Sequence, residues 1–358
     1  MLNTRKNYID NLRWICILFL FPYHTFMVYN TFESFYIKGT EIQATYYFFG
    51  ATWPWLMPLM FLLAGVSSAY ALQKRTAVEY LKERVFKLLI PLVFGVLLLV
   101  PVQTYFAEVF HNGYNGNYFG QYILFFTKPT DLTGYTGGFT PGHLWFILYL
   151  FIISIIALPF MRIYQKSSKK IPTYRISLAA LLLLFIIPVF SQIILDIGGK
   201  SVGEYLTWFL FGYFLISSEA IQDKLQKKRF LLLGIAVPCM LVYTFAGAAI
   251  QNYNTILYEL LYMFFAWSTI LAILGLGKQY LEFKNRMTTY LSKASFVIYV
   301  IHQQWIVVAA YFALKWIKGI PLQMISIIFP SIIFTLLTYE IFRRFSVTRF
   351  MFGLKEGH

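Results

Sequence analysis

Long apolar runs alternate with short polar segments along the whole chain, and ten of these runs have the length of a membrane-spanning helix. A hydrocarbon core about 30 Å thick requires roughly 20 helical residues. No internal repeat, linker or appended soluble segment interrupts the pattern, so we expect residues 1–358 to form a single transmembrane domain. The pattern predicts an all-α fold with about ten spans, at residues 12–31, 46–72, 84–107, 143–162, 176–196, 204–217, 229–249, 254–275, 294–315 and 321–342.

Positively charged residues mark one side of these predicted spans. The N-terminal segment, every second loop and the C-terminal tail together hold 25 of the 30 Lys and Arg residues, and the intervening loops hold the other five. Such an excess in short loops is typical of the cytoplasmic side. We therefore predict a multi-pass protein of the plasma membrane, the inner membrane in a bacterium, with both termini cytoplasmic. The first run lacks a cleavage pattern after it, so we expect it to stay in the mature protein.

The composition agrees with a membrane protein and excludes a nucleic-acid-binding one. Hydrophobic residues make up 59% of the chain and charged residues 13%, against roughly 25% charged in a soluble domain. The net charge of +15 is concentrated in one set of loops without a motif for base or phosphate recognition, which favours anionic membrane lipids as the partner. Cys16 and Cys239 fall in predicted spans and are interpreted as apolar packing residues.

The first apolar run carries an arginine and a histidine on one helix face. Arg13 and His24 are eleven residues apart, a rotation of about 1100°, which is within about 20° of three full turns. Asp10 shares this face, and the rise per residue places Arg13 and His24 roughly 16 Å apart along the axis. A histidine near the middle of a membrane is costly to bury, so His24 is a candidate functional residue.

Five stretches of the chain resemble the acyltransferase 3 family of integral membrane O-acyltransferases, in the order that the family shows. The family pairs an Arg or Lys with a His across ten residues in its first helix, as Arg13 and His24 are paired here. Two positions depart from the pattern, because Ala64 stands where Ser is usual and Lys87 takes the second basic place after Arg84. The stretches are IDNLRWICILFLFPYH, FLLAG at 61–65, KERVFKLLIP at 82–91, GHLWFILYL at 142–150 and ASFVIYVIHQQW at 294–305.

The resemblance implies a membrane enzyme that takes an acetyl- or succinyl-class acyl group from cytoplasmic acyl-CoA. The acceptor would be a hydroxyl of a glycan, a lipid or a small molecule. The C-terminal YEIFRRF and the absence of a hydrolase-like segment favour the stand-alone branch that includes periplasmic glucan succinyltransferases. Acyl-CoA is then a donor substrate, and no permanently bound cofactor is expected. No metal site is predicted, since the histidines fall on separate spans without the H-x-x-x-H spacing.

Three basic residues are candidates for binding the donor. A guanidinium binds phosphate bidentately, so Arg13, together with Arg84 and Lys87, is expected to hold the CoA phosphates. Asp10 is included as a candidate substrate-binding residue. Two alternatives stay open: Arg13 is an interfacial arginine or simply a partner of Asp10, and Arg84 and Lys87 are ordinary charges of a cytoplasmic loop.

His24 has two possible chemical uses, and the sequence leaves both open. As a general base, a neutral imidazole takes the proton of an attacking hydroxyl, which typically contributes 10²–10⁴-fold. As a nucleophile, it carries the acyl group itself. A purely structural histidine is the third interpretation.

Three further polar residues of the predicted spans are candidates for the same site. His302 is expected to orient His24, to share protons with it or to bind the acceptor. Tyr299, one turn away, is a candidate donor to the developing oxyanion. Glu259 is an acid inside the eighth span and should have a histidine or arginine partner. For each, packing or charge balance is the structural alternative.

Acceptor binding is expected at the outer ends of the spans. His143 and Trp145 begin the fourth span and are either acceptor-binding residues or anchors of an aromatic belt. The stretch 108–142, rich in Gly, Tyr and Asn, is expected to form a re-entrant or lid segment, a carbohydrate contact or a plain connection. We assign no chemistry to His111 or to the terminal His358.

A transporter or flippase that moves an acyl donor or a glycan lipid is the alternative function. Buried Arg, His and Glu residues suit that class as well. Transporters often contain structural repeats with broken helices in corresponding halves. No such symmetry is visible here, so the acyltransferase is the favoured prediction, ahead also of a catalytically inactive relative.

Overall fold

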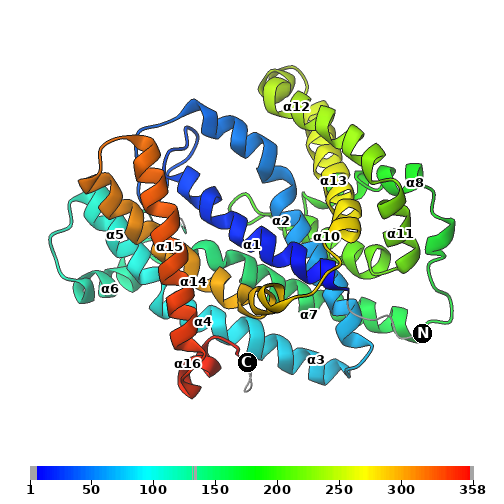
Figure 1. The fold of residues 1–358 in the computed structure, drawn as a ribbon, viewed down its shortest axis with the longest axis horizontal. Coiled ribbons are helices and arrows are strands. Elements are labelled where there is room, and N and C mark those ends of the chain that lie inside the picture. The colour runs from blue at the N-terminus through cyan, green and yellow to red at the C-terminus, as the bar shows by residue number, and fades with distance from the viewer. Residues whose placement is uncertain (1–5, 131, 133–134, 355–358) are drawn as a thin grey trace. The chain divides into compact units, whose positions relative to one another are not determined.

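The computed structural model describes residues 6–130, 132 and 135–354, and the regular elements of this part are helices, with one isolated β-bridge between Asp196 and Ser201 (Figure 1). The N-terminal half contains α1 (Asn7–Met27), α2 (Gln43–Leu72), α3 (Ala77–Arg84), the π-helix η1 (Val85–Leu89), α4 (Ile90–Leu98), α5 (Val100–Asn112), α6 (Tyr118–Thr127), η2 (Gly142–Leu144) and α7 (Trp145–Lys166). The C-terminal half contains η3 (Thr173–Arg175), α8 (Leu178–Leu183), α9 (Ile186–Ser191), α10 (Val202–Phe211), the π-helix η4 (Gly212–Ile216), α11 (Glu219–Lys227), α12 (Arg229–Tyr253), α13 (Thr255–Tyr280), α14 (Arg286–Trp316), α15 (Ile320–Phe342) and α16 (Ser346–Met351).

The all-α prediction is confirmed for the residues that the structure describes. Each of the ten predicted segments falls mainly on helix, and within the described ranges seven helices are long and apolar enough to cross a membrane. These seven are Gln43–Leu72, Ala77–Asn112, Gly142–Lys166, Arg229–Tyr253, Thr255–Tyr280, Arg286–Trp316 and Ile320–Phe342. The other three segments fall on α1, on the short pair α8 and α9, and on α10 with η4. The number of spans and the side of the termini stay predictions.

Several boundaries differ from the predicted ones for local reasons. Helix α1 ends at Met27 rather than at residue 31, and the stretch 108–142 is partly helical, since α5 continues to Asn112 and α6 lies within it. Gly113 ends α5 with a φ of 62°, which glycine adopts without strain. The side chain of Asn117 caps α6 by accepting a hydrogen bond of 2.8 Å from the backbone N–H of Gly120.

The described fold divides into two compact units, each assembled from separated parts of the chain. Unit 1 comprises residues 1–13, 47–82 and 152–288, and unit 2 comprises residues 14–46, 83–151 and 289–358, masked positions aside. Residues of both units therefore occur within α1, α2, α3, α7 and α14. The single-domain prediction for residues 1–358 is not tested by this division.

In unit 1, α2 contacts the junction of α10 and η4 at two glycines. A Cβ on Gly65 would lie 1.9 Å from the carbonyl oxygen of Phe209, and one on Gly212 would lie 2.0 Å from that of Leu62. Small residues permit this close approach of two helix backbones in a membrane protein. Gly65 belongs to the FLLAG stretch, so helix packing explains the glycine of that motif. Helices α12 and α13 of the same unit run side by side and are joined at Asn254 (Figure 1).

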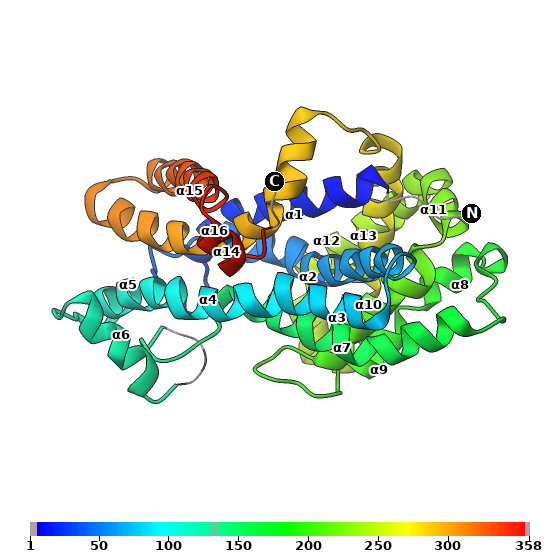
Figure 2. The same ribbon diagram turned by 90° about the horizontal axis from the view of Figure 1, so that it is seen from below.

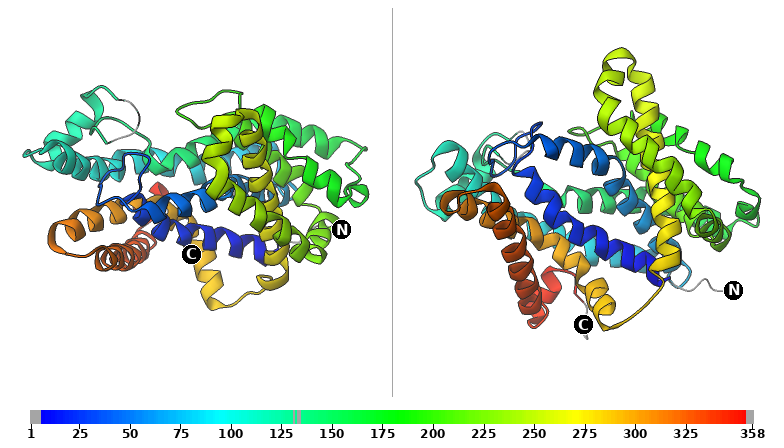
Figure 3. Two further views of the ribbon diagram at one scale, coloured as in Figure 1. Left: turned by 90° about the horizontal axis from the view of Figure 1, so that it is seen from above. Right: turned by 45° about the horizontal axis from the view of Figure 1, so that its top comes forward.

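In unit 2, α4 and α5 follow one another in line, and the part of α14 in this unit lies against them (Figure 2). The two elements run in the same direction, since Gly95 lies at the level of Val300 and the ring of Phe106 lies 5.0 Å from that of Tyr311. Helix α15 returns after a turn at Gly319, whose φ is 90° (Figure 3). The packing of α4, α5 and α14 places a set of polar side chains inside this unit.

Candidate functional site

Three histidines from three distant parts of the chain lie together in unit 2. His24 comes from the last turn of α1, His143 from η2 and His302 from the middle of α14. The ring centroids of His24 and His302 are 5.3 Å apart, and those of His143 and His302 are 5.1 Å apart. His302 is fully buried, His143 is 6% exposed, and His24 is partly exposed. The structure therefore brings together three residues that the sequence placed on separate spans.

The hydrogen bonds of His143 and His302 define which nitrogen of each ring carries the proton. His143 Nε2 lies 2.9 Å from the carbonyl oxygen of Val300, and His302 Nδ1 lies 2.6 Å from that of Tyr299. A carbonyl only accepts, so both of these nitrogens carry hydrogen and donate. In the neutral rings, His143 Nδ1 and His302 Nε2 are then lone-pair acceptors, and both are buried without a partner among the described residues. His24 Nδ1 is buried in the same way.

Tyr299 connects the start of the fourth predicted span to this cluster. Its hydroxyl donates a hydrogen bond to the backbone carbonyl of His143, and its ring centroid lies 5.7 Å from that of His302. The hydroxyl thus holds the turn of η2 in place, next to the imidazole of His143. Trp145, two residues further on, is half-buried and packs edge to face against Tyr149 at the beginning of α7.

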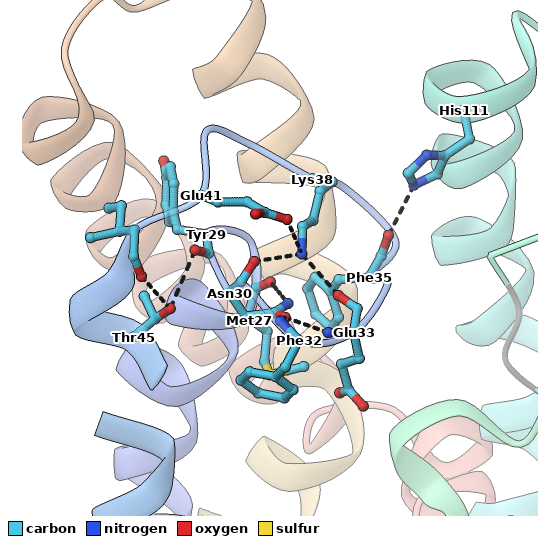
Figure 4. A network of polar contacts seen from close by, with 11 residues as sticks. Met27, Tyr29, Asn30, Phe32, Glu33, Phe35, Lys38, Glu41, Thr45 and His111 are labelled. Atoms are coloured by element: carbon cyan, nitrogen blue, oxygen red, sulfur yellow. Dashed lines mark hydrogen bonds and ion pairs between the residues drawn. The ribbon is translucent and has the colours of Figure 1, made fainter. Parts of the chain in front are cut away.

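The loop of residues 28–42, which follows α1, covers one face of His24. The ring of Phe35 stacks on the imidazole of His24 at an interplanar angle of 8° and a centroid distance of 6.2 Å. The carbonyl oxygen of Phe35 accepts a hydrogen bond of 2.9 Å from Nε2 of His111 on α5 (Figure 4). His24 therefore lies against both an aromatic ring of the loop and the imidazole of His302.

Polar contacts within the 28–42 loop fix its backbone. The amide oxygen of Asn30 accepts from the backbone N–H groups of Phe32 and Glu33, at 2.9 and 2.8 Å. The ammonium of Lys38 donates to the carbonyl oxygens of Asn30 and Glu33, and it lies 3.6 Å from a carboxylate oxygen of Glu41 (Figure 4). Since these contacts close the loop on itself, Phe35 has a defined position over the histidine.

Arg13 lies in unit 1 and makes specific contacts there. Its guanidinium donates to a carboxylate oxygen of Asp10 at 2.9 Å and to the hydroxyl of Ser67 on α2. Its side chain is 23% exposed. Ser67 follows the FLLAG stretch by two residues and was not identified from the sequence, although two adjacent serines in an apolar helix are a visible signal.

The beginning of α1 is anchored by carboxylates of unit 1. Glu282 accepts hydrogen bonds from the backbone N–H groups of Asn7 and Tyr8, at 3.0 and 3.1 Å, where a helix N-terminus favours negative charge. Lys6 donates to Glu219 at 2.8 Å, and this hydrogen bond lowers the pKa of the Glu219 carboxyl and raises the pKa of the Lys6 ammonium. These contacts hold the helix end that carries Asp10 and Arg13.

The other predicted residues are distributed over both units. Arg84 ends α3 and Lys87 lies in η1, both in unit 2, where Lys87 forms an ion pair of 3.1 Å with Glu83. A π-helical turn directly after Arg84 is unusual and is frequent at functional sites. Glu259 is half-buried on α13 of unit 1, within electrostatic range of Glu204. Its expected histidine or arginine partner stays a prediction.

Besides Ser67, the residues that sequence reasoning missed belong to the surroundings of His24. Phe35 and His111 were given no role, because a loop phenylalanine and a loop histidine have no spacing that connects them to the first span. No group of three His, Cys, Asp or Glu residues in the described part of the chain is arranged to hold a metal ion. His358 lies outside the described residues.

A helical fold with several membrane-length helices and three clustered histidines is that of an integral membrane protein with a hydrogen-bonding centre. The chain belongs to the acyltransferase domain family, whose sequence profile matches residues 6–340. Glucans biosynthesis protein C of Salmonella heidelberg and that of Salmonella agona are both 24% identical to it over 380 aligned residues. The alignments cover 98% of this chain and 95% of each relative. No solved structure matches the chain.

Family membership makes the chain an acyltransferase and confirms the resemblance seen in its motifs. The likeness to proteins named for glucan biosynthesis supports the stand-alone branch. The alternative of a transporter without chemistry loses its support. The roles of individual residues stay predictions, and the arrangement of His24, His143 and His302 is the observation on which they now rest.

Proposed function

We propose that this protein transfers an acyl group from acyl-CoA to a hydroxyl of a glucan, with His24 as the reacting base or acyl carrier. The observation that carries the proposal is the contact of His24 with Phe35 and His302, with Nδ1 of His24 unpaired among the described residues. The glucan acceptor follows from the likeness to proteins named glucans biosynthesis protein C. A lipid or a small-molecule acceptor is the less favoured choice.

The reaction balances without a metal or a redox cofactor. The acceptor hydroxyl oxygen forms a bond to the thioester carbonyl carbon, and the bond from that carbon to sulfur breaks. His24 takes the hydroxyl proton and returns it to the CoA thiolate, which leaves as the thiol. In the acyl-carrier version, a ring nitrogen of His24 bonds to the carbonyl carbon as the bond from that carbon to sulfur breaks, and CoA leaves as the thiolate. The acceptor hydroxyl oxygen then bonds to the same carbon, the bond from that carbon to the His24 nitrogen breaks, and the hydroxyl proton converts the thiolate to the thiol.

His302 and His143 have defined roles in this proposal. Each presents a buried lone-pair nitrogen beside His24, because its other nitrogen donates to a backbone carbonyl. A proton accepted by His24 can therefore be shared with a neighbouring imidazole, which stabilises the charged form in a region with little water. Tyr299 acts in this scheme by holding η2 and His143 in position, and its hydroxyl is the less favoured oxyanion donor since it is engaged with a carbonyl.

The donor side of the proposal rests on Arg13, Arg84 and Lys87. Each carries the charge that binds a phosphate, and Arg84 and Lys87 flank the start of a π-helical turn. Asp10 then orients the Arg13 guanidinium. Substitution of any of the three basic residues should raise the KM for acyl-CoA more than it lowers kcat. On the acceptor side, we propose that His143 and Trp145 bind the acceptor. Glu259 balances charge or contributes only slightly to catalysis.

The membrane and its orientation complete the proposal. The distribution of Lys and Arg supports cytoplasmic termini, and we propose the plasma membrane, which is the inner membrane in a bacterium, as the location. The acyl-CoA donor then approaches from the cytoplasm, while the glucan approaches from the opposite side. Acyl transfer across the membrane requires His24 to be reachable from both directions.

Acyl transfer by purified protein in nanodiscs tests the proposal. Acetyl-CoA and succinyl-CoA are supplied with glucose oligosaccharides, and both thiol release and acylated product are measured. We expect His24→Ala to lower turnover by about 10²–10⁴-fold, while binding of acyl-CoA is retained. A matched control is His111→Gln, which changes a histidine outside the cluster and keeps a hydrogen-bond donor. Donor turnover that survives in His24→Ala would overturn the assignment of this residue.

A mass measurement separates the two uses of His24. Incubation with donor alone, followed by rapid denaturation and peptide mapping, reveals an acyl group on the peptide that contains His24 if the residue is a carrier. An unmodified peptide, together with turnover that needs both substrates at once, supports the general base.

A further inference from the structure

Two glutamines form an incomplete hydrogen-bonded pair inside unit 2. Gln103 of α5 is fully buried, and Gln303 of α14 is 3% exposed. Nε2 of Gln303 lies 3.1 Å from Oε1 of Gln103. The remaining amide atoms, Nε2 of Gln103 and Oε1 of Gln303, have no partner among the described residues. The pair therefore presents one donor and one acceptor, whichever amide donates to the other.

This arrangement is costly as a purely structural contact. A hydrogen bond between helices stabilises a membrane protein only modestly, whereas each buried polar group without a partner loses the free energy of its hydration. Two apolar side chains of the same size would avoid that cost. Polar residues inside a membrane protein are more often retained for a substrate or an ion.

The pair adjoins the histidine cluster on one side. Gln303 directly follows His302, and α4 and α5 run beside α14 in the same direction, from the approach of Gly95 to Val300 to the contact of Phe106 with Tyr311. The contact between Gln103 and Gln303 lies between these two points, one residue beyond His302 on α14. This is the direction that the charge pattern predicts to lead away from the cytoplasm.

Further buried polar groups continue in the same direction. Nε2 of Gln121 on α6 donates to the hydroxyl of Thr104 at 3.1 Å and lies 3.2 Å from the carbonyl oxygen of Gly137. Both Gln121 and Thr104 are fully buried, and Oε1 of Gln121 has no partner among the described residues. Polar side chains therefore lead from the histidines towards the connection between α6 and η2.

We propose that Gln103 and Gln303 form a subsite for a sugar hydroxyl of the acyl acceptor, beside the hydroxyl that His24 activates. This inference rests on the proposed function for the identity of the acceptor. Nε2 of Gln103 donates to the oxygen of the bound hydroxyl, and the hydroxyl donates to Oε1 of Gln303. A hydroxyl both donates and accepts, so it satisfies the two free amide atoms at once. Saccharides carry hydroxyls on neighbouring carbons, so one can bind the glutamines while the next one reacts.

The subsite selects acceptors by their hydroxyls. A site built to hydrogen-bond a substrate hydroxyl rejects an analogue that lacks it, because the buried groups are left without partners. A simple alcohol with a single hydroxyl should therefore be a poor acceptor, and a deoxy sugar should be worse than the parent sugar.

Equilibrium binding of sugars to the full chain in nanodiscs tests the subsite without requiring catalysis. The probes are maltohexaose and laminarihexaose, and the variants are Gln103→Met, Gln303→Met and the double variant. Methionine keeps the volume of glutamine and removes the amide, so the double variant should fold. The matched control is Gln222→Met, which removes a buried amide of unit 1 that donates to the carbonyl oxygen of Ile216 at 2.8 Å.

We expect wild type and Gln222→Met to bind a hexasaccharide equally, and the double variant to bind it about tenfold more weakly, as the loss of a hydrogen bond implies. In the transfer assay, the KM for the sugar should rise with little change in the release of thiol from donor alone. Equal sugar binding by wild type and the double variant would show an amide pair bridged by water and overturn the subsite, as would no sugar binding by wild type. Glutamine-dependent binding without acyl transfer would support the subsite and contradict the proposed function.

Discussion

The Nε2 of His111 lies 2.9 Å from the carbonyl oxygen of Phe35, and Phe35 in turn stacks on His24. This contact connects α5 to the loop that covers the proposed reacting group. Because the carbonyl accepts, His111 must donate, and a glutamine at this position can donate as well. We therefore expect His111→Gln to keep most of the activity, and His111→Leu to lower kcat by about tenfold through loss of one hydrogen bond.

The His111 variants are compared by kcat, by the KM for donor and by thermal unfolding. A loss of kcat in His111→Leu at an unchanged unfolding temperature, with recovery in His111→Gln, supports a positioning role. Equal activity of the two variants would show that the 28–42 loop does not depend on this hydrogen bond.

A second prediction concerns the close contact at Gly65. Gly65→Ala places a methyl group 1.9 Å from the carbonyl oxygen of Phe209, so α2 and α10 must separate. We expect a loss of stability of about 3 kcal/mol or more, since the clash is with backbone. The matched control is Gly234→Ala in α12, where the described part of the chain has no neighbouring atom within 4 Å of the added Cβ and alanine favours helix by about 1 kcal/mol. Unfolding in detergent, followed by circular dichroism, compares the two, and equal stability would contradict the packing argument.

The elements of this fold were largely predictable from the sequence, since apolar runs near 20 residues define helices in a membrane. Arg13 and Asp10 also follow from helical spacing, and the structure shows them in contact. The contact of His143 with His302 could not be predicted from the sequence. The sequence places His143 at the end of a span, but the contact depends on how η2 packs against α14, which no local pattern encodes. The roles of Phe35 and His111 could not be predicted for the same reason, because their hydrogen bond joins residues that are 76 positions apart in the chain.

A third prediction concerns a buried ion pair near the connection between α5 and η2. Glu108 pairs with Lys128 and accepts from the side-chain amide of Asn112 at 3.0 Å. Its side chain is 5% exposed and that of Lys128 is 34% exposed. Removal of one partner of such a pair leaves a charge without compensation. We expect Lys128→Met to lower the stability by about 2 kcal/mol, a value below the fully buried range because Lys128 is partly exposed.

The double variant Glu108→Gln/Lys128→Met serves as the control for this pair. It removes both charges and should recover much of the lost stability, since a buried ion pair contributes little relative to neutral groups. Thermal unfolding of the wild type, both single variants and the double variant gives the coupling free energy. If the loss of stability in the double variant equals the sum of the losses in the two single variants, the two charges do not stabilise one another.

The last prediction separates positioning from oxyanion stabilisation at Tyr299. Tyr299→Phe removes the hydrogen bond to the carbonyl of His143 and leaves the ring in place. If Tyr299 positions η2, stability should fall by about 1–3 kcal/mol, because a buried carbonyl loses its donor, and kcat should fall by about tenfold. If its hydroxyl stabilises the oxyanion directly, kcat should fall by about 10²–10³-fold at nearly unchanged stability. Tyr243→Phe in unit 1 is the matched control, since it removes a hydroxyl contact of 2.9 Å with Tyr258 and should leave kcat unchanged. The contact with His143 favours the first outcome, and a large loss of kcat with full stability would contradict it.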